Sequence, residues 1–480
     1  MNHFSSADTL LIIAIVVIYI AVTTWMTFRL RSKSNSEFME GSKAMPAFVV
    51  GILLMSEFIG AKSTIGTAQS AFENGFAASW SIIGAAIGFP LFGLILVKRI
   101  YNTGKLTISG AVAEKFGQST KNIISIIMMY ALLLVNVGNY VSGAAAISTV
   151  LQVTLPVAAV ITAIVSTFYF AFGGMKGVAY VTVFHSAMKY FGVIAILYYA
   201  LHMTGGFTPM FEKMPDFYWT WDGKIGASTI AAWLIGTIGS IFCTQFVIQA
   251  ISSTKNAASA KRATMVAFFF CMPIALAIGV IGVCAKFLYP DMKSLYALPI
   301  FVQSMSPVMA GLVTTSLVAS IFVSVSTVAL AITSLAIKDF YVPYFKPTAE
   351  KEFRMTRILS LVIGFLPLVF VLFVPEILKL SFFTRAIRLS ITVVAIIAFY
   401  LPFFRSTRGA NAGLLGAAIM TTVWYLLGDP FGIDNMYVAL GSPAIIMILD
   451  QLIPNKAKQN NDLAKPFDNF DNVEPRQSEV

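Results

Sequence analysis

Residues 45–71 read MPAFVVGILLMSEFIGAKSTIGTAQSA, a span of membrane length that is apolar except at a few positions. It carries Glu57 and Lys62, and it holds glycines at Gly60 and Gly66. Charges at bilayer depth occur where they face a cavity, a partner or a permeant solute, and glycine allows a membrane helix to unwind. We therefore expect an interrupted transmembrane helix that lines a path for a solute.

A second apolar stretch repeats this pattern five spans later. In WLIGTIGSIFCTQ, residues 233–245, Gly236 and Gly239 precede the polar Thr244 and Gln245. Interrupted helices at matching positions of two five-helix halves indicate an inverted-repeat transporter with a binding site near the bilayer midplane. The alternative for each glycine pair is close helix packing through small residues.

The composition places the whole chain in a membrane. Of its 480 residues 58% are hydrophobic and only 11% are charged, and the mean hydropathy is +0.81. The net charge of +11 comes from bases in short loops between apolar spans, so we expect no nucleic-acid partner. The three cysteines are odd in number and lack CxxC spacing, which predicts neither disulfides nor a zinc site.

We predict an all-α polytopic protein with a transmembrane domain over residues 1–454 and a disordered cytoplasmic tail over 455–480. The thirteen predicted helices are 9–28, 46–70, 77–98, 122–150, 154–173, 178–203, 226–250, 264–287, 309–338, 357–375, 379–404, 410–427 and 436–453. The two repeats would cover about 46–203 and 226–404.

Lysines and arginines gather in alternate loops, around residues 29–43, 98–121, 255–262, 346–357 and 405–408. The positive-inside rule makes these loops cytoplasmic. We therefore expect the N-terminus outside and the C-terminus inside, in a multi-pass monomer of the cell membrane surrounded by lipid.

Five motifs in order along the chain resemble the sodium:solute symporter family, which includes glucose, proline, pantothenate and monocarboxylate symporters. The motifs are residues 38–46 (FMEGSKAMP), 66–75 (GTAQSAFENG), 172–178 (FGGMKGV), 253–262 (STKNAASAKR) and 324–341 (SVSTVALAITSLAIKDFY). The resemblance covers almost the whole chain and implies the leucine-transporter fold, a five-plus-five inverted repeat.

The resemblance also implies a sodium site where the second span unwinds against the ninth. Ser56 and Ile59 match the carbonyl donors of the second span, and Ser324 and Thr327 are the candidate hydroxyl ligands. The family usually has two adjacent hydroxyl residues in the ninth span, and here Val323 replaces the first. This departure leaves the expected sodium site incomplete.

The sixth span departs from the family pattern as well. Thr182 stands where the family has an acid that helps sodium bind or leave, and His185 stands where it has a glutamine. Lys189 follows two turns after Thr182. By resemblance to other transporters of this fold, Lys189 is either a cation that replaces sodium at a coupling site or a structural residue paired with a nearby carbonyl.

Positive charge exceeds negative charge in the predicted spans. The embedded cations are Lys62, Lys189, Arg385 and Arg388, against Glu57 alone. Because arginine offers a fork for a carboxylate, we expect a small carboxylate-bearing solute, with Gln245 as a further substrate or coupling candidate. Two alternatives are that Glu57 neutralises Lys62 and that the arginines reach the outer headgroups.

The sequence thus predicts a secondary active transporter that couples a small organic solute to a cation, with sodium favoured by the family. A proton-coupled or uncoupled carrier of the same fold is the alternative, and an ion channel is less favoured because matched broken helices suit alternating access. The three histidines are far apart, and the chain has no GxGxxG, P-loop or HExxH motif. We therefore expect neither an enzyme nor a cofactor.

Overall fold

The computed structural model describes residues 4–151, 153–371 and 377–453, and this part of the chain contains helices and no strand. The α-helices of the first half are α1 (Ser6–Arg29), α2 (Asn35–Glu40), α3 (Ala47–Phe58), α4 (Ala61–Asn74), α5 (Trp80–Ile95), α6 (Val97–Asn102), α7 (Ile108–Phe116), α8 (Gln118–Leu151), α9 (Leu155–Thr204) and α10 (Thr208–Lys213). Those of the second half are α11 (Ala227–Cys243), α12 (Gln245–Ser252), α13 (Ala257–Leu288), α14 (Pro307–Leu335), α15 (Val342–Phe345), α16 (Ala349–Phe365), α17 (Ile377–Tyr400), α18 (Thr407–Leu426) and α19 (Asn435–Leu452).

Short 3₁₀ turns complete the described elements. They are η1 (Gly41–Lys43), η2 (Phe76–Ser79), η3 (Asp216–Tyr218), η4 (Ser294–Tyr296), η5 (Pro299–Ser304), η7 (Leu366–Val369) and η9 (Pro430–Gly432). A π-helical turn, η6 (Ala336–Tyr341), continues α14.

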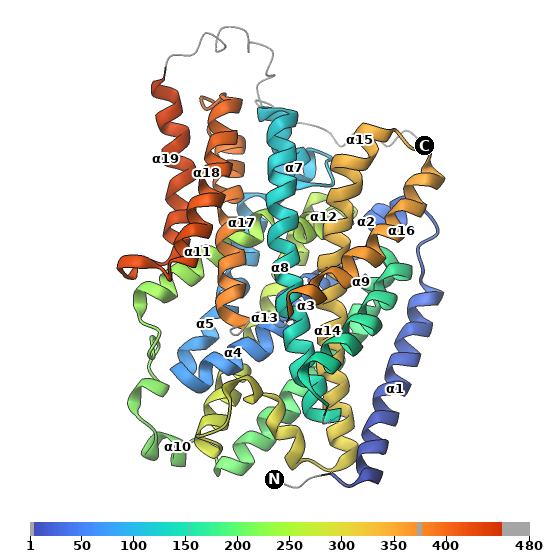
Figure 1. Cartoon of the computed structure of the whole chain (residues 1–480), viewed down its shortest axis with the longest axis vertical. Helices are drawn as coiled ribbons and strands as arrows, with labels where there is room; N and C mark the ends of the chain where they lie inside the picture. Colours follow the sequence, from blue (N-terminus) through green and yellow to red (C-terminus); the bar gives the residue numbers. More distant parts are fainter. Residues whose placement is uncertain (1–3, 152, 372–376, 454–480) are drawn as a thin grey trace.

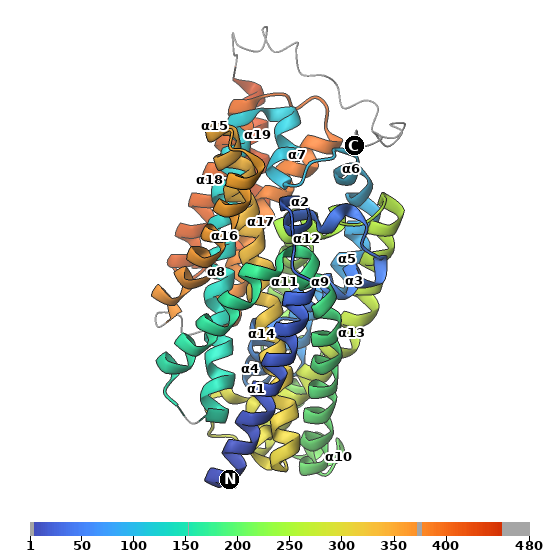
Figure 2. The same ribbon diagram turned by 90° about the vertical axis from the view of Figure 1, so that its right-hand side faces the viewer.

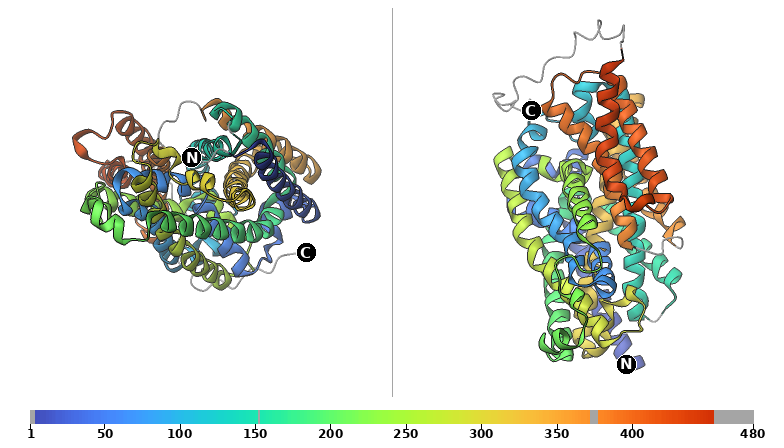
Figure 3. Two further views of the ribbon diagram at one scale, coloured as in Figure 1. Left: turned by 90° about the horizontal axis from the view of Figure 1, so that it is seen from below. Right: turned by 90° about the vertical axis from the view of Figure 1, so that its left-hand side faces the viewer.

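The helices form one elongated bundle (Figures 1 and 2). The start of α1 lies at one end of the bundle and the end of α19 at the other, and the view along the long axis shows the helices around a common centre (Figure 3). This placement agrees with an odd number of crossings. Which end faces the cytoplasm remains the sequence-based prediction given above.

Each of the thirteen predicted spans overlaps a helix or a broken helix pair in the described part of the chain, but the tenth, 357–375, overlaps α16 only up to Phe365, and its last four residues lie outside the described residues. Eight helices are long and apolar enough to cross a membrane, or up to ten if each of two bent pairs is one span. The other three predicted spans correspond to the first part of α9, to α16 and to α18. The predicted loop between residues 173 and 178 is a kink inside α9 at Gly174, which has a φ of 60°. The predicted tail lies outside the described residues.

Helix α14 runs through the interior, with every residue from Val313 to Leu335 buried, and packs against α8 and α9. Small residues allow this close approach, since a Cβ at Gly192 of α9 would lie 1.8 Å from Ser316 Oγ of α14. Buried hydroxyls such as Thr314 and Ser320 donate to carbonyls one turn back in α14. Burying these polar side chains in the central helix therefore costs little free energy.

At one end of α14, Asp339 joins η6 to two neighbouring helices. Its carboxylate is 1% exposed and accepts hydrogen bonds from Thr107, Ser109 and Ser125, at 3.1 Å from Thr107 and 2.6 Å from Ser125. Lys121 Nζ lies 3.1 Å from the same carboxylate. The charge is thus paired and fully hydrogen-bonded, as a buried carboxylate requires, and it fixes α7 and α8 to α14.

Candidate solute and cation site

Both predicted helix interruptions exist. Helix α3 ends at Phe58 and α4 begins at Ala61, with a bend of 45° between them, and Gly60 between the two is extended. Helix α11 ends at Cys243 and α12 begins at Gln245, with a bend of 47° at Thr244. We call these the first and the second break. Each leaves backbone carbonyls without their helical partners inside the protein.

Lys189 of α9 occupies the first break. Its ammonium Nζ donates to Ser56 O at 3.0 Å, to Ser56 Oγ at 2.8 Å and to Ile59 O at 2.6 Å, and the side chain is 1% exposed. The carbonyl end of α3 carries partial negative charge and favours a cation. Ser56 and Ile59 are the residues expected to hold sodium, so a lysine ammonium takes the ligands predicted for the ion.

Helix α14 lies directly against the first break. A Cβ added at Gly60 would lie 1.9 Å from Ser324 Oγ, so only glycine fits there. The hydroxyl of Ser324 donates to Ser320 O at 2.8 Å, and that of Thr327 turns back to Val323 O at 2.9 Å. The structure therefore brings Ser324 to the break together with Ser56, Ile59 and Lys189.

Two arginines of α17 contact the second break and helix α11, which ends at it. Arg388 Nη1 donates to Thr244 Oγ1 at 2.7 Å and its Nε donates to Thr384 O at 3.0 Å. Arg385 Nη1 donates to Ser81 O at 3.1 Å and to Thr237 Oγ1 at 2.7 Å. Both side chains are at most 3% exposed, which rules out contact with the outer headgroups.

Glu57 lies within electrostatic range of Lys62, Lys189, Arg385 and Arg388. These four are the buried lysines and arginines of the described chain, so the charges form one cluster. Among the described residues, no ion pair within 4 Å joins Glu57 to Lys62. This cluster therefore holds four basic side chains and one acidic side chain.

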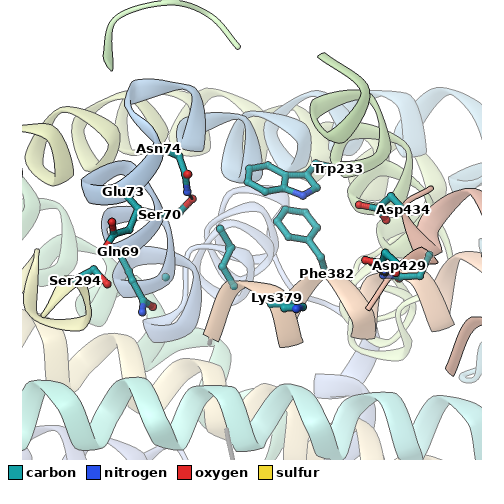
Figure 4. A pocket seen from close by; sticks show the side chains of 13 residues that line it. Gln69, Ser70, Glu73, Asn74, Trp233, Ser294, Lys379, Phe382, Asp429 and Asp434 are labelled. Carbon is teal, nitrogen blue, oxygen red and sulfur yellow. Dashed lines mark hydrogen bonds between the residues drawn. The ribbon is translucent and has the colours of Figure 1, made fainter. Parts of the chain in front are cut away.

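A cavity of about 480 Å³ opens beside this cluster, and Ser294 of η4 and Trp233 of α11 contribute to its lining. Gln69, Ser70, Glu73 and Asn74 of α4 line one side, and Asp429, Asp434 and Asn435 line the other. Figure 4 shows the Trp233 indole and the Phe382 ring between these two sides. The rings are stacked with centroids 4.3 Å apart, and the Arg385 guanidinium lies 4.6 Å from the Phe382 centroid.

Phe382 therefore separates the cavity from Arg385. A solute that enters the cavity reaches an aromatic pair first and a buried guanidinium behind it, and the ring stacking stabilises the pair in this position.

Three predicted site residues lie outside the charged cluster. Gln245 donates to Leu106 O at 2.9 Å and accepts from Ile108 N at 3.1 Å, so its amide holds the start of α7. His185 is hydrogen-bonded through Nδ1 to Tyr19 OH of α1. Thr182 is buried, one turn before His185, and its hydroxyl has no hydrogen-bond partner among the residues that the structure describes.

Sequence reasoning missed the Trp233–Phe382 pair and the carboxamide of Gln69, whose buried Oε1 has no partner among the described residues. It also gave no role to Asp339. Every predicted span of this chain contains at least one aromatic residue, so no spacing distinguishes these two from the rest.

The arrangement of broken helices defines a transporter of the leucine-transporter fold, and solved structures agree. A sodium-coupled sialic acid symporter, solved in a substrate-bound outward-open state, superposes with a TM-score of 0.80 over 92% of this chain and 98% of its own, at 17% sequence identity. A transporter of the nucleobase-cation-symport-1 family, solved with bromovinylhydantoin bound, has a TM-score of 0.58 over 91% and 100% of the two chains, at 15% identity.

The chain belongs to the sodium:solute symporter family, whose model matches residues 38–417. A sodium/proline symporter of Haemophilus influenzae is 24% identical over 90% of this chain and 92% of its own. The human high-affinity choline transporter 1 is 23% identical over 71% of this chain, and the match spans 63% of the human protein, under two thirds of its length. The family consists of membrane transporters and not of enzymes.

Proposed function

We propose that this protein is a secondary active transporter that carries a small carboxylate-bearing solute together with a cation, by alternating access. The observation that carries the proposal is the buried surplus of positive charge around the two breaks, with four cations against Glu57. Such charge is costly in a low-dielectric interior unless an anion offsets it.

The two arginines support a carboxylate as that anion. A guanidinium has five N–H donors in a planar fork, and Arg388 uses only Nε and Nη1 in its hydrogen bonds to the described residues. Arg385 uses only Nη1 in this way. Each arginine thus keeps donors for the two oxygens of a carboxylate, which is the geometry that arginine recognises best.

Lys62 supports the same substrate class. Its side-chain stem packs near Gly138 of α8, where a Cβ would lie 3.8 Å from Lys62 Cδ, and no carboxylate of the described residues lies within 4 Å of its ammonium. The ammonium therefore remains available to a solute held between α4, α8 and α17.

Two coupling cations are candidates. Sodium is supported by the family and by the sodium-coupled sialic acid symporter with which this chain superposes. The proton, the alternative, is favoured by the position of Lys189 at the first break.

A thermal-shift screen of the purified protein against monocarboxylates, dicarboxylates, amino acids and neutral sugars tests the substrate class. Ligand binding stabilises a protein in proportion to the logarithm of ligand concentration over Kd, so hits identify the class directly. We expect carboxylates to raise the melting temperature and Lys62→Gln or Arg388→Gln to weaken that rise. A neutral sugar as the best ligand, bound normally by both variants, would contradict the proposal.

A further inference from the structure

We propose that the cavity beside the charged cluster is a binding site for an organic ammonium group that carries N–H donors. The inference goes beyond the proposed function, because it concerns a group of the opposite charge to the carboxylate, on the other side of Phe382. It starts from the charges of the cavity lining.

The lining of the cavity is acidic. Glu73 of α4, Asp429 and Asp434 contribute three carboxylates, against the single ammonium of Lys379. Among the described residues, no ion pair within 4 Å joins Lys379 to any of these acids. Figure 4 shows Glu73 on one side of the cavity and both aspartates on the other. A cation in the cavity would therefore lie between opposed carboxylates.

The two aspartates also lie close enough to affect each other. Asp434 precedes α19, outside the predicted span 436–453. Burial raises the pKa of Asp434, a hydrogen bond from Met436 N opposes this rise, and the nearby charge of Asp429 adds to it. A cation between the two carboxylates would relieve their repulsion.

A buried amide oxygen indicates a ligand with N–H donors. The Asn435 side chain lines the cavity and is 4% exposed, and its Nδ2 donates to the two carboxylate oxygens of Asp429, at 3.0 and 3.2 Å. Only the nitrogen end of an amide donates, so Oδ1 is the other end. This Oδ1 is buried and has no hydrogen-bond partner among the described residues. A buried acceptor without a donor is unfavourable, and an ammonium N–H would satisfy it.

The aromatic pair suits a cation attached to an apolar chain. Trp233 and Phe382 stack with centroids 4.3 Å apart, and the Arg385 guanidinium lies 4.6 Å over the Phe382 ring. Phe382 therefore has a neighbour on each face, and the Trp233 indole is the ring left for a ligand. Indole attracts cations more strongly than the other aromatic side chains.

A bare metal ion fits this lining less well than an organic cation. Within the part of the chain that the structure describes, no three acidic, histidine or cysteine side chains converge closely enough to hold a metal ion. The cavity volume of about 480 Å³ is in the range that takes a small organic molecule. Separated carboxylates, an amide oxygen and an indole together recognise an alkylammonium.

The ammonium group has two possible sources. Phe382 separates the cavity from Arg385, so a zwitterionic solute would hold its ammonium in the cavity and its carboxylate behind the ring. A separate amine would occupy the cavity alone. Both sources present the same chemistry to the cavity, and the experiment distinguishes them.

The experiment uses the emission of Trp233, which lines the cavity, as its readout. The full-length protein is titrated at constant ionic strength with butylammonium, butyltrimethylammonium and butanoate, and the response of Trp233 is the part that Trp233→Phe loses. We expect a saturable response to butylammonium. Butyltrimethylammonium has no N–H and should bind about fivefold more weakly. Butanoate carries no ammonium, so its binding tests the proposed function alone.

Variants of the lining test the contacts one by one. Glu73→Gln and Asp434→Asn should each raise the Kd of butylammonium about threefold, whereas Glu212→Gln, an exposed acid outside the lining, should leave it unchanged. Lys379→Gln should lower the Kd about twofold, because it removes a like charge. In Asn435→Ala the preference for butylammonium over its trimethyl analogue should shrink, which a general loss of structure would not cause. Melting temperatures without amine identify any variant that fails to fold.

Three results would overturn the inference. They are the absence of a saturable response to butylammonium, an unchanged Kd in both Glu73→Gln and Asp434→Asn, and equal binding of the trimethyl analogue by the native chain.

A last titration, with 4-aminobutyrate and 6-aminohexanoate, assigns the source. Binding of either about tenfold tighter than butylammonium, with the gain lost in Arg388→Gln, would support the site and identify the ammonium as part of the solute. Binding no tighter than butylammonium would support the site for a separate amine.

Discussion

The two breaks of this molecule are built alike and are filled by different cations. Helices α3–α4 and α11–α12 stand at corresponding places in the two predicted repeats, and each break is met by a cation from the last helix of its own repeat. Lys189 comes from α9 and Arg388 from α17. The lysine uses every donor on the protein, whereas the arginine keeps several. The difference shows that the same kind of helix break can be held by a cation whose donors are all used within the protein or by one that has donors left.

Removing the arginine should have the largest effect. We expect Arg388→Gln to weaken carboxylate binding by about 2 to 5 kcal/mol, because a buried hydrogen-bonded charge loses its partner. Thermal shift or calorimetry with an acid from the screen measures this loss. Lys189→Gln should change the affinity far less, and Arg405→Gln, in an exposed loop, is the control. If Arg388→Gln and Lys189→Gln lowered the carboxylate affinity equally, the two breaks would not differ in their contribution to solute binding.

Adding a methyl group at or near each break should have the next largest effect. The loss of stability should be larger at the first break than at the second. At Gly60 an added Cβ would lie 1.9 Å from Ser324 Oγ, 2.8 Å from Ser324 Cβ and 3.0 Å from Glu57 O. We expect Gly60→Ala to lower the free energy of unfolding by about 1 to 3 kcal/mol, as overpacking does.

At Gly239, one turn before the second break, the added Cβ meets Leu389 Cδ1, the movable end of a side chain. Gly239→Ala should therefore cost less than Gly60→Ala, and the melting temperatures of the two variants give the comparison. A larger loss for Gly239→Ala would show that the second break is the more tightly packed one.

The smallest effect concerns the loop ahead of the first break. Glu37 of α2 accepts from Lys33 N at 2.8 Å and pairs with Lys176 of α9 at 3.0 Å, and these two partners hold the pKa of Glu37 below its ordinary value of 4.5. A lowered pKa adds stability above the ordinary pKa, and this stability is lost as the pH falls through the folded value.

Glu37→Gln should thus destabilise the protein by less than about 1 kcal/mol at neutral pH, since the pair is partly exposed, and by less still in acid. Melting temperatures measured as a function of pH, with Glu212→Gln as the control, test this expectation. If the loss of stability in Glu37→Gln did not change with pH, Glu37 would stabilise the protein through packing and not through its charge.

The sequence was sufficient to predict both breaks, because glycines and polar residues inside apolar spans have few other causes. It also singled out Lys189, Arg385 and Arg388 as buried charges. It could not place them, since the partners of Lys189 lie about 130 residues away along the chain. The sequence left two roles open for Lys189, a coupling cation or a residue paired with nearby carbonyls. Both roles use the same contacts, because Lys189 binds the carbonyls that were predicted to hold sodium.

Gln245 shows a case in which the sequence assigned a residue to the solute site and the structure places its side chain elsewhere. Its position at the second break made it a candidate for the solute, but a side chain at the first residue of a helix points wherever the bend directs it. Here it points to α7, where Leu106 and Ile108 use its amide. The direction of such a side chain depends on the angle between two helix segments, which residue spacing does not encode.

The surplus charge around the breaks has an electrical consequence. Charges fixed to a helix bundle that rocks between two faces move relative to the field across the membrane, and each elementary charge is worth about 2.3 kcal/mol per 100 mV. The four cations and one carboxylate of the cluster would make the unloaded protein sensitive to that field, and the carboxylate solute proposed above would reduce the sensitivity. A voltage that is negative inside should therefore bias which face an unloaded molecule presents more strongly than it biases a loaded one.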